Sequence, residues 1–402
     1  MRLGSVLTGV VVCALASAGS ASADVNVYSS LPRQGTSAEQ TRAVEQGIRL
    51  ALADFGGRAG GLTVNYIGLD DSSRSNPGTA DEEQTRRNAV RVAGDRFAVG
   101  YVGEFNSGGS KVSIPILNRA GILQVSPSNT HIGLTRRGPG TVPGEPERYY
   151  PTGRRTYARI LPTDAVQADV LATLVRDSGC SSVSFVWDGS QYGAGIVVSA
   201  RRAARRLGQR TSSTVMLSKD LGRALRSRAR RVTAPCVVYG GVTGNGAVEH
   251  FRALAAGHPG RRFFASDGVA ETAFSHPRAG GIPASIGRRT LIAVATLGVR
   301  DLPDAGQAMA ARFFAAYRVR SIDPYAVYGY ESMRIVLDAI AGAAPRGNDR
   351  GAVVDAFWAA GVRHGVLGTY SFDANGDTTQ RRYGIYGISG GWVTYRRAIV
   401  AR

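Results

Sequence analysis

Apolar positions along the chain follow two alternating patterns, short apolar runs and longer stretches with one apolar face. Up to residue 130, the short runs predict buried strands at 25–30, 62–70, 97–103 and 122–126. Between them, apolar residues spaced three or four apart predict helices that begin near residues 37, 79 and 110. Strands that alternate with helices of this length are typical of a parallel, doubly wound α/β sheet.

The first of these helices begins with a sequence pattern typical of a helix N-terminus. Ser37 is followed three residues later by Gln40, which is the pattern of a capping box. Val44, Ile48 and Ala51 then share one face of the predicted helix. We therefore expect the side chains of Ser37 and Gln40 to serve the helix terminus.

A stretch rich in Pro, Gly and Arg at 132–158 interrupts the alternation, and we expect it to be a surface excursion. A second set follows, with strands expected at 183–188, 213–217, 236–241, 261–268 and 291–298 and helices at 192–207, 220–231 and 246–256. The last part predicts helices near 305–318, 325–343 and 351–361 and hairpins at 368–380 and 383–396. A chain of 402 residues suits two lobes of about 150–200 residues, and this order predicts that it crosses between them more than once.

The first 23 residues are typical of a secretory signal peptide. Arg2 is followed by an apolar stretch and by the small residues Ala21-Ser22-Ala23, which suit a cleavage site. The apolar stretch is too short for a membrane anchor, and bulky Val12 before Cys13 disfavours a lipoprotein site. We expect a soluble mature protein that starts near Asp24 and is exported to the periplasm or the cell exterior.

Export changes the interpretation of the cysteines. After removal of Cys13, the even pair Cys180 and Cys236 remains in an oxidising compartment. Each begins an apolar run, and the starts of two parallel strands can be neighbours. We predict a Cys180–Cys236 disulfide.

The formal net charge of +19 raises the possibility of nucleic-acid binding. Nearly all of the positive charge is arginine, because Lys111 and Lys219 are the only lysines. The basic pairs are scattered along the chain, and the denser stretch at 223–231 is typical of a solvated helix face. We therefore expect no nucleic-acid partner.

Polar residues cluster where predicted strands end, and ligands of parallel sheets bind beyond the carboxyl ends of the strands. In the first lobe these ends carry the segments 103–110 and 126–130, which offer hydroxyls and the start of a helix and suit a carboxylate. In the second lobe they carry Tyr192 and Asp267, an aromatic wall and an anion that suit an ammonium group. A ligand with both groups is an α-amino acid.

Each of these features also has a simpler explanation. The segment 106–110 could be only a helix cap, and 126–130 an ordinary turn. Tyr192 could be a packing residue and Asp267 a turn aspartate. Their shared location at strand ends favours the ligand site.

Catalytic and metal-binding motifs give no support to an enzyme. The chain has no G-x-S-x-G elbow, no H-E-x-x-H and no P-loop, and its five histidines are isolated. Asp373 to Asp377 resembles the start of a calcium loop but lacks the later glutamate, so a hairpin turn is expected there. We expect no catalytic residue, cofactor or metal.

The stretch VGEFNSGGSKVSIPILNRAGILQVSPSNT at 102–130 resembles the periplasmic leucine/isoleucine/valine-binding proteins. These are the solute-binding components of branched-chain amino acid ABC importers. The resemblance continues in QYGAG, CVVYGG, FFASDGV and FDANGD and covers nearly the whole mature chain. It implies a type I periplasmic-binding-protein fold, in which two doubly wound lobes joined by three hinge crossings close on the ligand like a Venus flytrap.

The resemblance also implies lobe boundaries and ligand residues. It assigns 24–160 plus 297–367 to lobe one and 161–296 plus 368–402 to lobe two. Ser107 resembles the serine that holds the α-carboxylate, with Thr130 and the backbone near Ser128, Tyr192 resembles the cleft tyrosine, and Asp267 lies where an acid pairs with the α-ammonium. The full expected set is Phe105, Asn106, Ser107, Ser128, Asn129, Thr130, Tyr192 and Asp267.

Three positions depart from the family pattern. Asp267 replaces the glutamate that is usual in the family, and Val242 replaces an aromatic residue. The first loop carries Arg33 and Thr36 where the family usually has a second aromatic residue. Since the resemblance implies that these positions contact the ligand's side chain, they leave the choice among leucine, isoleucine, valine and other solutes open. A larger, more polar or non-amino-acid solute is compatible with the sequence.

The function expected from the resemblance is capture of an amino acid, branched-chain or otherwise aliphatic, and delivery to ABC permease transmembrane subunits by a monomeric receptor. A sensing module without transport is the alternative. An exported hydrolase that uses Ser107 would need a general base that the sequence does not supply.

Overall fold

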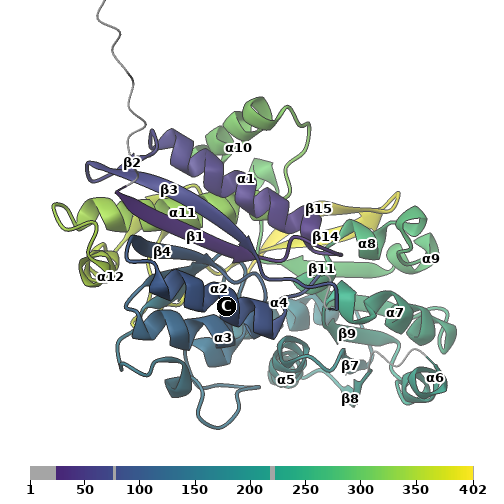
Figure 1. Ribbon diagram of the computed structural model, residues 1–402. Coiled ribbons are helices and arrows are strands. Elements are labelled where there is room, and N and C mark those ends of the chain that lie inside the picture. The colour runs from purple at the N-terminus through teal and green to yellow at the C-terminus, as the bar shows by residue number, and fades with distance from the viewer. Residues whose placement is uncertain (1–23, 76–77, 218–221, 402) are drawn as a thin grey trace, which may run out of the picture.

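The computed structural model describes residues 24–75, 78–217 and 222–401. The chain forms two lobes, each built on a sheet with helices packed against it (Figure 1). Strands of the first sheet, in spatial order, are β2 (Arg58–Ala59), β3 (Leu62–Asp70), β1 (Val25–Leu31), β4 (Ala98–Gly103), β5 (Leu123–Ser126) and β6 (Tyr157–Arg159). From β3 to β6 every neighbour is parallel, which confirms the parallel sheet predicted for the first lobe.

The second sheet repeats this arrangement and ends in an antiparallel hairpin. Its strands, in spatial order, are β15 (Trp392–Val400), β14 (Arg382–Ser389), β11 (Thr290–Val294), β10 (Arg262–Ser266), β9 (Cys236–Gly240), β7 (Val183–Trp187) and β8 (Thr211–Met216). The strands β11 to β8 are parallel, and β14 and β15 form the predicted hairpin. A separate small hairpin joins β12 (Arg363–Gly365) and β13 (Gly368–Tyr370).

Helices cover both sheets. Those packed on the first sheet are α1 (Ala38–Asp54), α2 (Glu82–Gly94), α3 (Ser107–Arg119), α11 (Tyr325–Gly342) and α12 (Arg350–Ala359), and α10 (Asp304–Tyr317) packs against α1 and α11. The second lobe contains α4 (Asp164–Asp177), α5 (Gln191–Arg206), α6 (Arg223–Arg230), α7 (Ala247–Ala256), α8 (Thr272–Ser275) and α9 (Ala284–Gly287). Short 3₁₀ turns are η1 (Ile132–Leu134), η2 (Glu147–Tyr149), η3 (Thr243–Asn245), η4 (Asp267–Val269), η5 (Pro277–Ala279) and η6 (Val299–Asp301). Among the described residues, no helix is long and apolar enough to cross a membrane.

The helices α1 and α11 approach each other closely because each presents a glycine to the other's backbone. A Cβ on Gly47 would lie 2.0 Å from the carbonyl oxygen of Ala326, and a Cβ on Gly329 would lie 2.2 Å from that of Val44. Only glycine fits at such contacts. This packing places the start of α11 at the cleft between the lobes.

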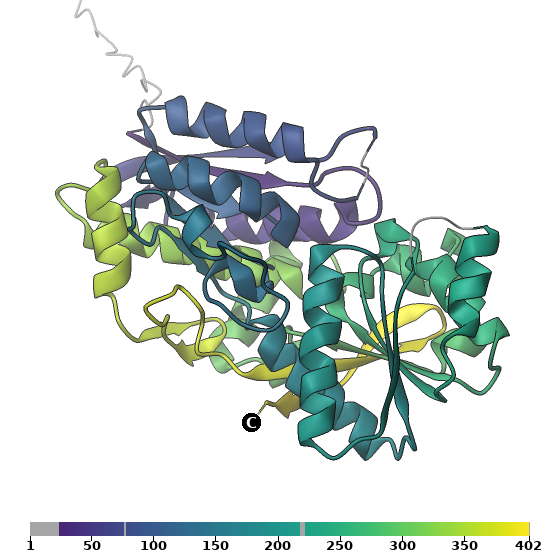
Figure 2. The same cartoon turned by 90° about the horizontal axis from the view of Figure 1, so that it is seen from below.

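The chain passes between the lobes three times, as predicted from the resemblance. The crossings follow β6 at residues 160–163, β11 at residues 295–303 and β13 at residues 371–381. Figure 2 shows the two lobes side by side with the crossing segments between them. The residue-by-residue lobe boundaries given above stay a prediction.

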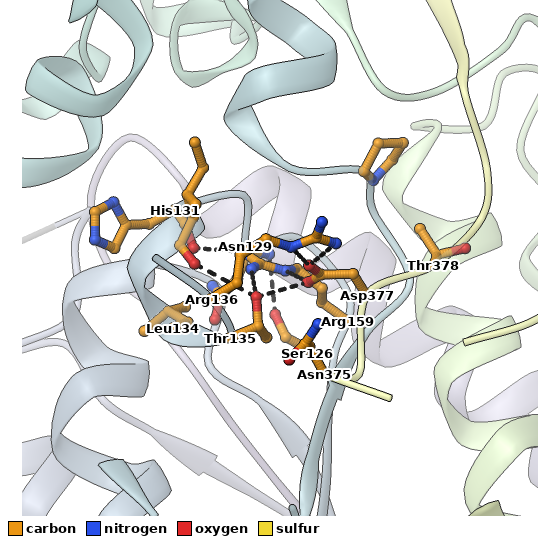
Figure 3. Close-up of polar contacts among 12 residues, drawn as sticks. Ser126, Asn129, His131, Leu134, Thr135, Arg136, Arg159, Asn375, Asp377 and Thr378 are labelled. Carbon is orange, nitrogen blue, oxygen red and sulfur yellow. Dashed lines mark hydrogen bonds and ion pairs between the residues drawn. The ribbon is translucent and has the colours of Figure 1, made fainter. Parts of the chain in front are cut away.

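A buried ion pair joins the first and third crossings (Figure 3). Arg159 Nε donates to Asp377 Oδ1 at 2.7 Å, and both side chains are shielded from solvent. Arg159 Nη1 also donates to the carbonyl oxygen of His131 at 2.6 Å, and Arg136 Nε donates to Asp377 Oδ2 at 2.6 Å. Burial alone would raise the pKa of Asp377, but the charges of Arg159 and Arg136 hold it below its ordinary value.

The predicted disulfide and the predicted turn at 373–377 are both present in the structure. Cys180 and Cys236 form the expected disulfide, next to the amino ends of β7 and β9. The segment 373–377 forms a turn stabilised by its own backbone, with the N–H of Gly376 donating to the carbonyl of Asp373 at 2.9 Å. The predicted signal peptide at 1–23 lies outside the described residues.

Gly47→Ala should destabilise the fold, because the added methyl group meets backbone that cannot move away. We expect the free energy of unfolding to fall by about 1–3 kcal/mol, the usual cost of overpacking. Gly94→Ala at the end of α2 is the matched control, since a Cβ there meets nothing within 4 Å. It should leave stability unchanged or raise it by about 0.4–1 kcal/mol. Urea unfolding of both variants measures the difference, and equal losses would contradict the close approach.

Asp377→Asn should be far more damaging than Asp373→Asn. Removing one partner of a buried ion pair costs about 3–5 kcal/mol, whereas the pair of Asp373 with Arg136 is partly exposed and worth less than about 1 kcal/mol. Because the pKa of Asp377 is lowered in the fold, its contribution is present above the ordinary aspartate pKa of about 3.9 and is lost as the pH falls through the folded-state pKa. Urea unfolding at pH 7 and at pH 3 checks both points, and similar losses for the two variants would refute the ranking.

Candidate functional site

The carboxyl ends of the two parallel sheets face each other across a cleft that holds a cavity of about 190 Å³. Residues from both lobes line it, including Phe105, Ser107 and Thr130 on one side and Tyr192 and Asp267 on the other. The chemistry of the cavity therefore depends on how the lobes meet. This is the location expected for a ligand site in an open parallel sheet.

The structure brings seven of the eight predicted site residues to this cavity. They are Phe105, Asn106, Ser107, Ser128, Thr130, Tyr192 and Asp267. Asn129 is different, because its side chain is fully buried and occupied by other parts of the fold. Its Nδ2 donates to the carbonyls of Glu104 and Phe105 at 3.0 Å, and its Oδ1 accepts from the Tyr157 hydroxyl at 2.9 Å. Asn129 holds two loops together and does not line the cavity.

Ser107 is the first residue of α3, and its geometry leaves donors for a ligand. Its Oγ accepts weakly from the N–H of His131 at 3.4 Å, so the hydroxyl proton can be donated elsewhere. Amide N–H groups in the first turn of a helix lack intrahelical acceptors and carry partial positive charge. At Gly108 a Cβ would meet nothing within 4 Å, so the backbone is open to the cavity at that point. This end of the cavity suits a carboxylate.

The loop 126–130 uses most of its polar groups to fix its own shape. Ser126 Oγ donates to the carbonyl of Glu104 at 2.9 Å and accepts from the N–H of Asn129 at 3.0 Å. Ser128 Oγ donates to the carbonyl of Phe105 at 2.6 Å. The hydroxyl of Ser128 is therefore occupied as a donor, and Thr130 is the other hydroxyl residue of this loop that lines the cavity.

Asp267 lies on the opposite side, at the start of η4, and three protein groups donate to it. Tyr192 Oη and Gln167 Nε2 donate to Oδ1 at 2.5 and 2.7 Å, and Tyr325 Oη donates to Oδ2 at 3.1 Å. Burial raises the pKa of Asp267 above its ordinary value, and the three donors offset part of this rise. An ionised carboxylate has about four lone-pair positions, so one remains for a ligand.

Tyr325 is a cavity residue that sequence reasoning missed, although its helix was predicted. It is the first residue of α11, which follows α10 in the first lobe. Besides its bond to Asp267, its ring packs edge-on against Phe105 with the ring centroids 5.1 Å apart. No local sequence signal marks it, because its place in the cavity depends on the packing of α11 and on Asp267 of the other lobe.

Ser37 and Gln40 do not form the predicted capping box. Ser37 precedes α1 but makes no side-chain bond to the helix terminus. Its Oγ lies 3.0 Å from Glu271 Oε1 in the other lobe, and Gln40 Nε2 donates to the carbonyl of Ala270 at 3.1 Å. Both side chains bridge the cleft, because partners in the other lobe are available to them when the lobes meet.

The excursion at 132–158 is only partly a surface loop. Glu145 is buried, and its Oε1 accepts from Gln191 Nε2 of α5 at 2.8 Å. Burial alone would raise the pKa of Glu145, but hydrogen bonds from His131, Tyr149 and a backbone N–H hold it well below its usual range. The excursion thus reaches the second lobe through a buried carboxylate, which the Pro- and Gly-rich composition did not indicate.

Lys111 is a further cavity residue that the sequence analysis did not assign to the site. It follows Ser107 by one helical turn, which places it on the same face of α3. It is half-buried and forms no ion pair or hydrogen bond within the part of the chain that the structure describes. Burial lowers the pKa of Lys111, and the nearby charge of Glu145 counteracts this. Its ammonium adds positive charge at the carboxylate end of the cavity.

With this geometry described, comparison with known proteins is informative. The sequence profile of the periplasmic binding protein family matches residues 27–391. The chain belongs to this family. Its members are solute-binding proteins rather than enzymes, and the two-lobed type I fold agrees with that membership.

Two Leu/Ile/Val-binding protein homologs of Brucella abortus (strain 2308) are similar to this chain over nearly its whole length. Homolog 2 is 24% identical over 392 residues, covering 94% of each chain. Homolog 1 is 24% identical over 393 residues, covering 95% of each chain. The likeness therefore extends over both lobes.

Solved structures show the same fold at lower identity. A leucine binding protein LivK from Thermotoga maritima MSB8 superposes with a TM-score of 0.77 at 19% identity, covering 94% of this chain and 99% of the other. LivJ from Streptococcus pneumoniae in complex with isoleucine gives 0.75 at 18% identity, with 94% and 99% covered. A solute binding protein from R. palustris in complex with benzoate gives 0.73 at 18% identity, with 94% and 96% covered.

Proposed function

We propose that this chain is the extracytoplasmic solute-binding protein of an ABC importer, which captures an α-amino acid between its lobes and delivers it to the permease. The observation that carries the proposal is the opposed polarity of the cavity. Ser107, the first turn of α3 and Lys111 offer donors and positive charge on one side, and Asp267 offers a carboxylate on the other. An α-carboxylate and an α-ammonium match these two sides.

Ligand capture follows from where these groups lie. The carboxylate would bind Ser107, Thr130 and the first-turn N–H groups of lobe one, and the ammonium would bind Asp267 of lobe two. A ligand held by both lobes favours the closed arrangement, because its full set of contacts exists only there. Hydrogen bonds to charged groups contribute about 1.5–3 kcal/mol each, so Ser107 and Asp267 would be the main anchors.

Delivery to a permease and export to the periplasm or cell exterior are supported by the family and by its relatives. Proteins of similar fold are described as binding leucine or isoleucine, so branched-chain and other aliphatic amino acids are the first ligands to test. Benzoate, the ligand of another structure of similar fold, has a carboxylate but no ammonium. Asp267 disfavours such a ligand here, because its buried carboxyl group would face no counter-cation.

Asp267→Asn should weaken amino-acid binding while the fold is kept. Loss of the charge that pairs with the α-ammonium removes about 1.5–3 kcal/mol, so we expect affinity to fall by about 10- to 150-fold. Isothermal titration with a panel of aliphatic and polar α-amino acids, on protein refolded from denaturant to remove bound ligand, measures the effect.

Asp355→Asn is the control for this experiment, since the Asp355 side chain is 78% exposed on α12. Its affinity should stay within about twofold of the unsubstituted protein. Unchanged affinity in Asp267→Asn would remove the ammonium assignment. No heat from any amino acid with the unsubstituted protein would refute the proposed function.

A further inference from the structure

The cavity is also lined by polar side chains that an α-carboxylate and an α-ammonium would not use. Glu271 is one of them, four residues after Asp267 in the chain. Ser37, Gln40 and Thr79 of lobe one line the cavity with it.

The carboxyl group of Glu271 is short of hydrogen-bond donors. The residue is only 5% exposed, and its Oε2 has no hydrogen-bond partner among the described residues. Its Oε1 lies 3.0 Å from Ser37 Oγ, but the same hydroxyl lies 2.7 Å from the carbonyl oxygen of Gly78. A serine hydroxyl has one proton, so it donates to only one of these two acceptors at a time. A buried carboxyl group with so few donors is unfavourable unless a ligand supplies one.

Asp267 provides the contrast within the same segment. It receives three donors from Gln167, Tyr192 and Tyr325, spread over both of its oxygens, whereas Glu271 has a hydrogen-bond partner on Oε1 alone, the Ser37 hydroxyl that also approaches a carbonyl oxygen. Burial raises the pKa of Glu271 to about 7, and the nearby hydroxyls of Thr243, Ser37 and Thr36 offset part of this rise. The protein thus completes the hydrogen bonding of one cleft carboxyl group and leaves the other incomplete.

A second cavity continues past Glu271. It has a volume of about 360 Å³, and Gln40, Glu271 and Tyr325 line both cavities. Glu39 and Asp323 add two more acidic side chains, and no arginine or lysine lines it among the described residues. In a chain with 49 basic residues, this composition favours an N–H donor or a cation over an anion.

We propose that the bound amino acid has a side chain that ends in an N–H donor, an ammonium or an amide group, and that this donor binds the Glu271 carboxyl group. The inference rests on the proposed function, since it assumes that the α-groups lie at Ser107 and Asp267. An aliphatic side chain would bury the lone pairs of Glu271 against methyl groups. A side-chain carboxylate would place two acids together.

Two isosteric pairs of α-amino acids test this directly. Ornithine and norleucine have the same number of side-chain heavy atoms and differ by a terminal ammonium in place of a methyl group. Glutamine and glutamate differ by an amide NH₂ in place of an oxygen. Isothermal titration on refolded protein at pH 7.5 should show ornithine or glutamine binding at least about tenfold more tightly than its partner. A preference for ornithine identifies a cationic ligand, and one for glutamine a neutral amide.

Glu271→Leu should remove this preference and leave norleucine bound as well as before or better. Glu271→Gln keeps the shape and is the second variant, in which ornithine should weaken by about tenfold. Asp355→Asn again serves as the exposed control and should keep the original ranking.

The possible failures can be told apart. Norleucine binding as tightly as ornithine, together with glutamate binding as tightly as glutamine, overturns the inference and leaves the proposed function standing. A ranking unchanged in both Glu271 variants overturns it as well. Binding of none of the four amino acids overturns this inference, and only the absence of heat with the whole amino-acid panel overturns the proposed function.

Discussion

The buried ion pair between Arg159 and Asp377 is the constraint on which the arrangement of the cleft depends. It joins the first crossing between the lobes to the third, and the N–H of Arg159 also donates to the carbonyl of Gly376 at 3.0 Å. Arg159 further holds the carbonyl of His131, which follows Thr130 at the cavity wall. The hinge and one side of the ligand site are therefore fixed by a single guanidinium. A fork of several directed donors suits this task, because it sets geometry at several acceptors at once.

The two acidic side chains of the second lobe show how burial is managed differently at neighbouring positions. Asp267 accepts from Gln167 of α4 and Tyr192 of α5 in its own lobe, so its orientation is set before any ligand arrives, and Tyr325 of α11 in the other lobe adds a third donor. Such preorganisation reduces the conformational entropy that is lost when the site is ordered on binding. Glu271 is held mainly by a residue of the other lobe, so its surroundings are complete only when the lobes meet. One carboxyl group is a fixed anchor, and the other depends on the state of the cleft.

Much of the fold followed from local patterns. The alternation of apolar runs predicted the parallel sheets, the terminal hairpin and the edge where the site lies, because these depend on residues close together in the chain. The disulfide followed from two strand starts in one sheet. Strand ends also brought Ser107 and Asp267 into the expected site, since all carboxyl ends of parallel strands lie at one edge.

The errors share a physical cause. Ser37 matched a local capping pattern, but its partner Glu271 is 234 residues away, and no short motif records such a contact. Asn129 was assigned to the ligand because it lies at a strand end, while Tyr157 and two carbonyls already occupy its side chain. Glu145 lay in a stretch whose composition indicated a surface loop, and its carboxylate accepts from Gln191 of the other lobe. Contacts between residues far apart in the chain decide all three.

Lys111 occupies a position where the cavity is too small to hold both an arginine side chain and a ligand. Lysine and arginine together number 49, and only two are lysine, yet one of those two faces the cavity. An arginine there would bring a broad planar group with five N–H donors into a space of about 190 Å³. The compact ammonium places the same charge on a slender stem and leaves the volume to the ligand. A substitution that is neutral elsewhere on this protein's surface would here compete with the solute for room.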